Sequence, residues 1–203
     1  MITIVDYKAG NLTSVKRALD HLGIPNQVSA DPQTVINAGR VIFPGVGAAG
    51  AAMGILKERG LDVALKECFA KGTPILGICL GCQIILTHSE EDDTDCLDLL
   101  PGACVRFRVS DPALKIPHMG WNAVSVLRPH PLLNHLRPGD EFYFVHSYYP
   151  KPADPTQIYA VSDNGGPFPA AIGKDNLFAV QFHAEKSGPV GLKVLENFEN
   201  WNQ

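Results

Sequence analysis

Short apolar runs that alternate with helical patterns constrain the fold of this chain more than any other feature. Residues 2–5, 41–43 and 74–78 each have the composition of a buried strand. Leucine and valine recur every three or four residues across 12–22, and a second helical stretch covers 49–70. Strand, helix and strand repeated in this order predict a parallel sheet with helices on both faces.

The second half of the chain is richer in strands. Glycine and proline clusters separate five apolar segments, which we interpret as strands at 123–127, 141–148, 158–161, 170–172 and 177–182. Apolar residues on one face then predict a carboxyl-terminal helix. The sequence therefore predicts one α/β domain over 1–203, with a mixed, mostly parallel sheet flanked by helices and additional antiparallel strands in the second half.

Composition excludes several classes of protein. The 203 residues are 45% apolar and 19% charged, which is typical of a globular domain. A formal net charge of −4 gives nucleic-acid binding no electrostatic support, and no apolar run is long enough to span a bilayer. Residues 1–6 are interpreted as a first strand and not as a signal peptide. Five irregularly spaced cysteines argue against a disulfide framework, so we expect a cytoplasmic protein.

A cysteine follows the third apolar run at a predicted strand-to-helix turn. The segment Gly-Ile-Cys-Leu-Gly at 77–81 has the spacing of a nucleophile elbow, with Cys79 in its strained centre and its sulfur exposed. The start of the following helix favours a thiolate, and its amide groups favour an oxyanion. Leu80 is the expected first oxyanion donor, and the loop carrying Val46 and Gly47 is expected to supply the second.

Cys79 also belongs to a Cys-x-x-Cys pattern with Cys82, which is found in redox pairs and in half zinc sites. No second Cys-x-x-Cys occurs and the remaining cysteines lack ligand spacing, so a zinc site is disfavoured. A dithiol oxidoreductase remains an alternative. We otherwise expect Cys82, one turn into the helix, to face the core.

A nucleophilic cysteine requires a base, which is usually a histidine held by a third group. His183 follows the last predicted strand, where functional residues of α/β sheets gather. Glu185 is two residues further along, so in an extended segment its side chain points to the same side as the histidine. The sequence therefore predicts a triad of Cys79, His183 and Glu185.

Two stretches together resemble the class I, triad-type glutamine amidotransferases. They are Gly-Ile-Cys-Leu-Gly-Cys-Gln at 77–83 and Gln-Phe-His-Ala-Glu at 181–185. Four further stretches narrow the resemblance to the glutaminase subunits of imidazole glycerol phosphate synthases: DYKAGN at 6–11, PGVG at 44–47, PHMGWN at 117–122 and FVHSY at 144–148. The resemblance runs from about residue 2 to about residue 200.

This resemblance implies hydrolysis of glutamine to glutamate and ammonia through a glutamyl thioester on Cys79. His183 would transfer protons and Glu185 would hold its ring. The residues that match glutamine-binding positions, or line the same pocket, are Gln83, Glu91, His146, Ser147 and Tyr148. No cofactor and no metal are implied.

The resemblance also implies a partner, a (β/α)8-barrel synthase subunit that uses the ammonia to make imidazole glycerol phosphate in histidine biosynthesis. Lys186 matches a position near the interface of this heterodimer. Two alternatives remain open. The same glutaminase could serve another acceptor, such as one in a sugar-amidating pathway. A catalytically silent regulatory module could also keep the fold, although the intact triad argues against it.

Three residues depart from the pattern of the family. Ala184 stands where proline usually separates the histidine from the glutamate, Lys8 stands where glycine is frequent, and Cys82 stands where methionine is frequent. Alanine leaves φ unrestricted, so it could loosen the triad. None of the three departures removes a reacting group.

Overall fold

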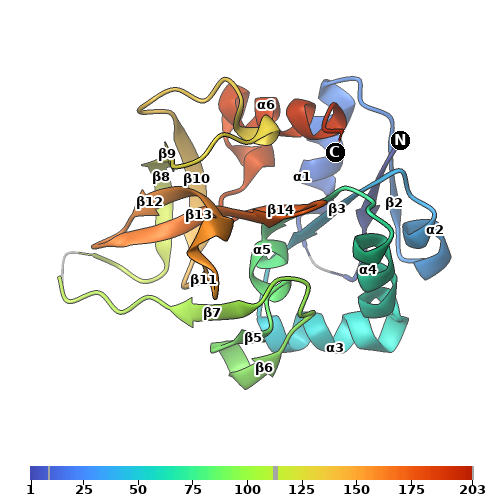
Figure 1. Cartoon of the computed structure of the whole chain (residues 1–203), viewed down its shortest axis with the longest axis horizontal. Coiled ribbons are helices and arrows are strands. Elements are labelled where there is room, and N and C mark those ends of the chain that lie inside the picture. Colours follow the sequence, from blue (N-terminus) through green and yellow to red (C-terminus); the bar gives the residue numbers. More distant parts are fainter. Residues whose placement is uncertain (9, 112–113, 203) are drawn as a thin grey trace.

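An eight-stranded sheet crosses the molecule in the computed structural model, which describes residues 1–8, 10–111 and 114–202 (Figure 1). Its strands, in spatial order, are β2 (Asn26–Ser29), β1 (Ile2–Val5), β3 (Arg40–Gly45), β4 (Ile75–Cys79), β14 (Leu177–Val180), β13 (Pro167–Lys174), β12 (Ile158–Asp163) and β9 (Ser125–Val126). The first five strands of this spatial order, from β2 to β14, pair in parallel. The last three, β13, β12 and β9, are joined to the sheet and to one another by antiparallel pairing. The predicted mixed α/β sheet is confirmed.

Helices cover both faces of this sheet. Figure 1 shows α1 (Leu12–His21) and α6 (Gly188–Glu199) on one side, and α3 (Ala49–Arg59), α4 (Leu61–Ala70) and α5 (Leu80–Ile84) on the other. The short helix α2 (Pro32–Ile36) packs with α4. The helical stretch predicted at 49–70 is two helices, α3 and α4, separated by Gly60 in a left-handed conformation.

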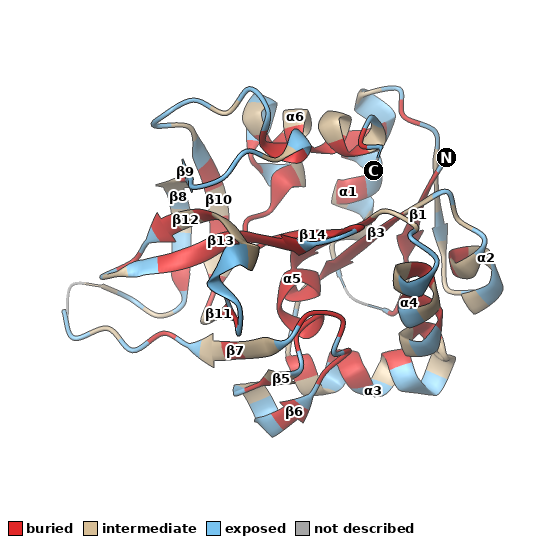
Figure 2. Ribbon diagram, in the orientation of Figure 1, coloured by how far each residue is buried: buried red, intermediate tan, exposed pale blue. Residues whose placement is uncertain are grey.

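The core is divided by the sheet into two clusters. Ile42 of β3 packs in the cluster under α1 and α6, whereas its neighbours Val41 and Phe43 pack in the cluster under α3 and α4. This alternation follows from the two-residue period of a strand. Because both faces are covered, the central strands are almost entirely buried (Figure 2) and their sequences are mostly apolar.

Two smaller sheets lie beside the main one. The first pairs β10 (Glu141–His146) with β8 (His118–Ala123), and the second has the order β11 (Tyr148–Pro152), β7 (Gly102–Arg106), β5 (His88–Ser89) and β6 (Thr94–Asp95). Short 3-10 helices occupy η1 (Glu91–Asp93), η2 (Pro131–Leu133), η3 (Pro155–Gln157) and η4 (Ala184–Lys186).

Two predicted strands differ from the structure. The segment predicted at 123–127 is divided, because β8 ends at Ala123 and the buried Val124 separates it from β9. The segment predicted at 141–148 is also two strands, β10 and β11, which belong to different sheets and meet at Ser147. No helix of the described ranges is long and apolar enough to cross a membrane.

Candidate active site

The turn between β4 and α5 has the geometry that the glycine spacing predicts. Cys79 ends the strand and caps the helix with φ 56° and ψ −108°, a conformation that residues with a side chain rarely adopt. A Cβ atom at Gly81 would lie 1.9 Å from the carbonyl oxygen of Phe43. A Cβ atom at Gly77 would lie 3.0 Å from the Gly81 carbonyl oxygen. The elbow therefore depends on glycine at both positions.

Cys79 is less exposed than predicted. Its exposed fraction is 6%, because it lines a cavity of about 270 Å³ and does not lie on an open surface. The cavity walls come from six separate segments of the chain. They are Val46, Gly47, Cys79, Leu80, Gln83, Glu91, Pro117, Val145, His146, Ser147, Tyr148 and His183.

His183 borders the same cavity and is held by several hydrogen bonds. Its Nδ1 atom and the Oε1 atom of Glu185 are 2.8 Å apart, and both side chains are buried. The main-chain amide of His183 donates to the carbonyl of Tyr143, and the Ser187 hydroxyl donates to the carbonyl of His183. The side-chain amide of Asn11 donates to the same Oε1 atom of Glu185. Glu185 is therefore positioned to orient the imidazole, as the spacing predicts.

The pKa of His183 reflects two opposing effects. Burial of the ring lowers the pKa, but hydrogen bonding to Cys79 and Glu185 and the negative charge of both groups raise it to about 10. Glu185 occupies Nδ1, so the interaction with Cys79 falls to Nε2. That nitrogen is buried, and no other described residue donates to it or accepts from it. The site favours a protonated imidazole next to the cysteine.

The predicted substrate residues and oxyanion donors all border the cavity that contains Cys79. Gln83 donates through Nε2 to the carbonyl of Tyr148, at 2.8 Å, and to the side-chain oxygen of Gln181, at 3.0 Å. Leu80 begins α5 directly after the nucleophile. Gly47 has φ 99°, which favours glycine in the loop facing it.

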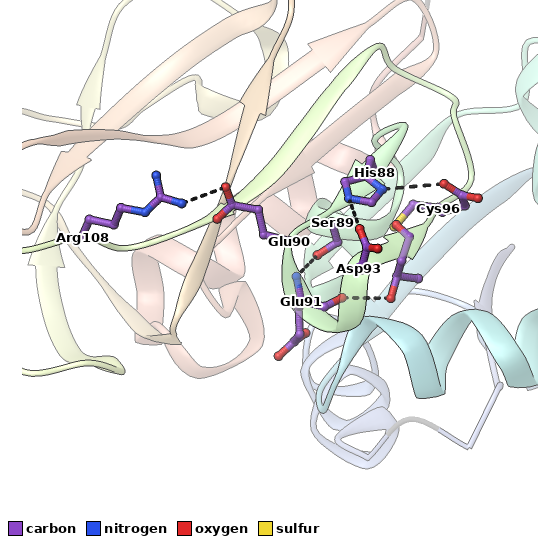
Figure 3. Close-up of polar contacts among 9 residues, drawn as sticks. His88, Ser89, Glu90, Glu91, Asp93, Cys96 and Arg108 are labelled. Carbon is purple, nitrogen blue, oxygen red and sulfur yellow. Dashed lines mark hydrogen bonds and ion pairs between the residues drawn. The ribbon is translucent and has the colours of Figure 1, made fainter.

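Glu91 comes from the acidic loop between β5 and β6 (Figure 3) and borders the cavity. Its carboxylate accepts a hydrogen bond of 2.8 Å from the main-chain amide of Ala49, at the start of α3. Its own main-chain amide donates to the hydroxyl of Ser89. Burial raises its pKa, and the Ala49 hydrogen bond offsets part of this effect. The neighbouring Glu90 pairs instead with the exposed Arg108.

A buried histidine pair lies next to the cavity, and its member His146 forms part of the cavity wall. The side-chain amide of Asn122 donates to the carbonyl of Asp163, which fixes its nitrogen and makes Nε2 of His118 an acceptor. His118 therefore donates through Nδ1 to Nε2 of His146, and His146 donates through Nδ1 to the carbonyl of Tyr148. Burial lowers the pKa of His146 to about 3, so its ring is neutral at physiological pH.

The remaining predicted residues lie away from the cavity. Lys186 is exposed in η4. Cys82 is fully buried in the core, as expected, and burial raises the pKa of its thiol. Ala184 is buried, and Lys8 is exposed beside the 46–47 loop. Ala9 of the DYKAGN stretch lies outside the described residues.

Sequence reasoning missed two residues that contact the triad. Asn11 bonds Glu185 and Gln181 bonds Cys79, and both belong to stretches that carried the resemblance. The five cysteines are free thiols, and no group of three potential metal ligands occurs in the described part of the chain.

Comparison with known proteins decides the family. The family described as Glutamine amidotransferase class-I matches residues 3–200. The chain belongs to the class I glutamine amidotransferases. This amidotransferase is 52% identical to the imidazole glycerol phosphate synthase subunit HisH of Desulfovibrio desulfuricans, covering 98% of this chain and 93% of the relative. It is 46% identical to the HisH subunit of Thiobacillus denitrificans, covering 99% and 91%.

Solved structures share the fold of this amidotransferase. A structure described as glutamine amidotransferase superimposes with a TM-score of 0.76 at 16% identity, covering 98% of this chain and 100% of the other. The structure of PurLQS from Thermotoga maritima also gives 0.76, at 20% identity and coverages of 98% and 97%. At these identities the similarity concerns the fold alone.

Proposed function

We propose that the protein hydrolyses glutamine, with Cys79 as nucleophile, His183 as proton carrier and Glu185 as the group that orients His183. One observation carries this proposal. Cys79 and His183, 104 residues apart (183 − 79), border the same small cavity, and a carboxylate holds the far side of the imidazole at 2.8 Å. This arrangement is that of a cysteine–histidine–acid triad.

The reaction follows from these three side chains. The Cys79 thiolate attacks the side-chain amide carbon of glutamine, and the carbonyl oxygen becomes an oxyanion. His183, protonated through its raised pKa, gives its proton to the departing nitrogen, so ammonia leaves and a glutamyl thioester remains. Water then attacks the thioester while His183 takes a proton from it. Collapse of the second oxyanion releases glutamate and restores the thiolate.

The oxyanion is stabilised by main-chain amides at the two edges of the cavity. Leu80, at the start of α5, supplies the first amide, and the loop containing Val46 and Gly47 supplies the second. Support comes from the strand pairing, because Gly45, at the end of β3, lies in register with Cys79. The loop therefore leaves the sheet beside the nucleophile.

Polar groups in the same cavity hold the amino-acid end of glutamine. The carboxylate of Glu91 is suited to an ammonium group, and Gln83 presents a side-chain oxygen that can accept a hydrogen bond. The chain segment with His146, Ser147 and Tyr148 lines the same cavity. Glutamine has the charges that such a pocket would recognise.

The ammonia is consumed by a second subunit. Relatives about half identical over nearly the full chain are named as subunits of imidazole glycerol phosphate synthase, which supports the same role here in histidine biosynthesis. The partner is a (β/α)8-barrel synthase, the interface includes Lys186, and the complex works in the cytoplasm. Hydrolysis without a partner would waste glutamine, so the loop at 44–47 completes the oxyanion site only in the loaded complex.

The test is steady-state release of glutamate by the chain alone, with the synthase, and with synthase plus an acceptor analogue. We expect a weak rate for the chain alone and a strong increase in the last mixture. The Cys79→Ala variant should still fold and bind the synthase, but its rate should fall by several powers of ten. A Cys79→Ala rate near that of the wild type would refute the assignment of the nucleophile. Equal wild-type rates in all three mixtures would refute the gating alone.

A further inference from the structure

Gln181 is a fully buried polar residue beside the nucleophile that the reaction described above does not use. Strands β4 and β14 run in parallel, with Val180 paired to Ile78. The next residues of the two strands are Gln181 and Cys79, which are therefore neighbours at the same edge of the sheet. The main-chain amide of Gln181 donates to the carbonyl of Ala170 at 2.9 Å, which fixes its backbone.

The orientation of the Gln181 amide is determined by a chain of hydrogen bonds. The carbonyl of Tyr148 can only accept, so the atom of Gln83 that lies 2.8 Å from it is the nitrogen. The same nitrogen is 3.0 Å from the side chain of Gln181, which must present its oxygen there. The nitrogen of Gln181 consequently points the other way, and it lies 3.7 Å from the sulfur of Cys79.

We propose that Gln181 is a catalytic residue for this reaction, donating an N–H hydrogen bond that stabilises the Cys79 thiolate, and that Gln83 is the residue that orients it. The proposal rests on the glutaminase function given above. Gln181 exchanges no proton and forms no covalent bond. Its donor group favours the sulfur anion that attacks glutamine, and favours the same anion when it leaves the thioester.

The arrangement separates this task from substrate binding. Gln181 is 0% exposed and does not border the cavity, so its amide meets the sulfur from inside the protein. His183 approaches the same sulfur from the cavity. The negatively charged sulfur of Cys79 is thus contacted by the imidazolium of His183 on the cavity side and by the neutral side-chain amide of Gln181 on the inner side.

The pH at which Cys79 loses its proton tests this proposal directly. The full chain is treated with iodoacetamide over a range of pH, and alkylation of the peptide that contains Cys79 is followed by mass spectrometry. Gln181→Leu and Gln181→Met both remove the donor at similar volume. We expect the midpoint for alkylation to rise by about one pH unit in both variants. Gln157→Leu, the same change in η3 away from the cavity, should leave the midpoint unchanged.

Other titratable groups near the sulfur stay the same in these variants, so a shift in midpoint reports the loss of the donor. They are Tyr7, Cys82, Glu91, Cys104, His146 and His183. Urea unfolding identifies which variants are folded, and having two replacements keeps the test available if one is not.

Glutamine hydrolysis in the complex with the synthase gives an independent measurement. We expect kcat of the Gln181 variants to fall about tenfold, with KM for glutamine nearly unchanged because Gln181 does not border the cavity. If a folded Gln181 variant shows the same alkylation midpoint as the wild type, the proposal is overturned, and this holds even if the wild-type chain is a glutaminase. If Cys79→Ala keeps hydrolysing glutamine, the function fails instead, and the alkylation midpoints still show whether the hydrogen bond acts on the thiol.

Discussion

The backbone at Cys79 predicts an inverted order of stability between two inactive variants. At most positions replacing alanine by glycine destabilises a protein, because glycine loses more conformational freedom on folding. At Cys79 the angles φ 56° and ψ −108° are the mirror image of an extended conformation, which glycine adopts readily and alanine does not. Cys79→Gly should therefore be more stable than Cys79→Ala.

The magnitude follows from two opposing effects. A backbone held in such a region costs about 1–3 kcal/mol for a residue with a side chain. The greater freedom of glycine in the unfolded chain opposes this by roughly 0.5–1 kcal/mol. Taking the middle of each range, the difference leaves Cys79→Gly about 1 kcal/mol more stable, or about 2–4 °C higher in Tm for a chain of this size.

Urea unfolding of the two variants measures this difference. Neither carries a thiol at position 79, so loss of the nucleophile affects both equally. Similar slopes against urea would show that the two variants expose similar surface on unfolding. If Cys79→Gly is equal to or less stable than Cys79→Ala, the strain assigned to this turn is absent.

Three further predictions concern the surroundings of the triad. Gly81→Ala should lose about 1–3 kcal/mol of stability in urea unfolding, because its Cβ would meet the Phe43 carbonyl, whereas Gly54→Ala, with open space around its Cβ, should not be destabilised. Cys82→Met should keep glutaminase activity within about tenfold of the wild type while losing about 1–3 kcal/mol; near-total loss in a folded variant would favour a dithiol reaction. The raised pKa of His183 contributes stability that is complete below pH 6.5 and is lost as the pH rises through about 10. Between pH 6.5 and about 10, the unfolding free energy of the wild type should thus fall more than that of His183→Gln. Plots of unfolding free energy against pH that stay parallel for the two proteins would contradict this prediction.

Apolar runs predicted the central strands and several half-buried strands of the second half, but they missed β2 and β7. β1, β3 and β4 are mostly apolar strands inside the sheet, interrupted only by Thr3 and Arg40. β2 is an edge strand, Asn-Gln-Val-Ser, which is only partly buried, so its sequence has no apolar run to detect. β7 forms by pairing with β11, far along the chain, and this partner determines it more than its own composition.

The same limit applies to the site. Cys79 was predicted because two glycines beside it mark the turn, and His183 because it follows a strand. Gln181 and Asn11 carry no such local signal, since their partners are 102 and 174 residues away in sequence. The sequence also predicted an exposed sulfur at Cys79, whereas segments from elsewhere in the chain enclose it.

The carboxylate of Glu91 gives the first amide of α3 its acceptor from 42 residues away. In the proposed function the same carboxylate binds the ammonium group of glutamine. An occupied pocket would then draw Glu91 away from Ala49 and leave that amide without its hydrogen bond. Exchange of the Ala49 amide proton with deuterated water would accelerate as glutamine binds, so a single main-chain position can serve as a built-in spectroscopic probe of occupancy, even in a variant that cannot turn over.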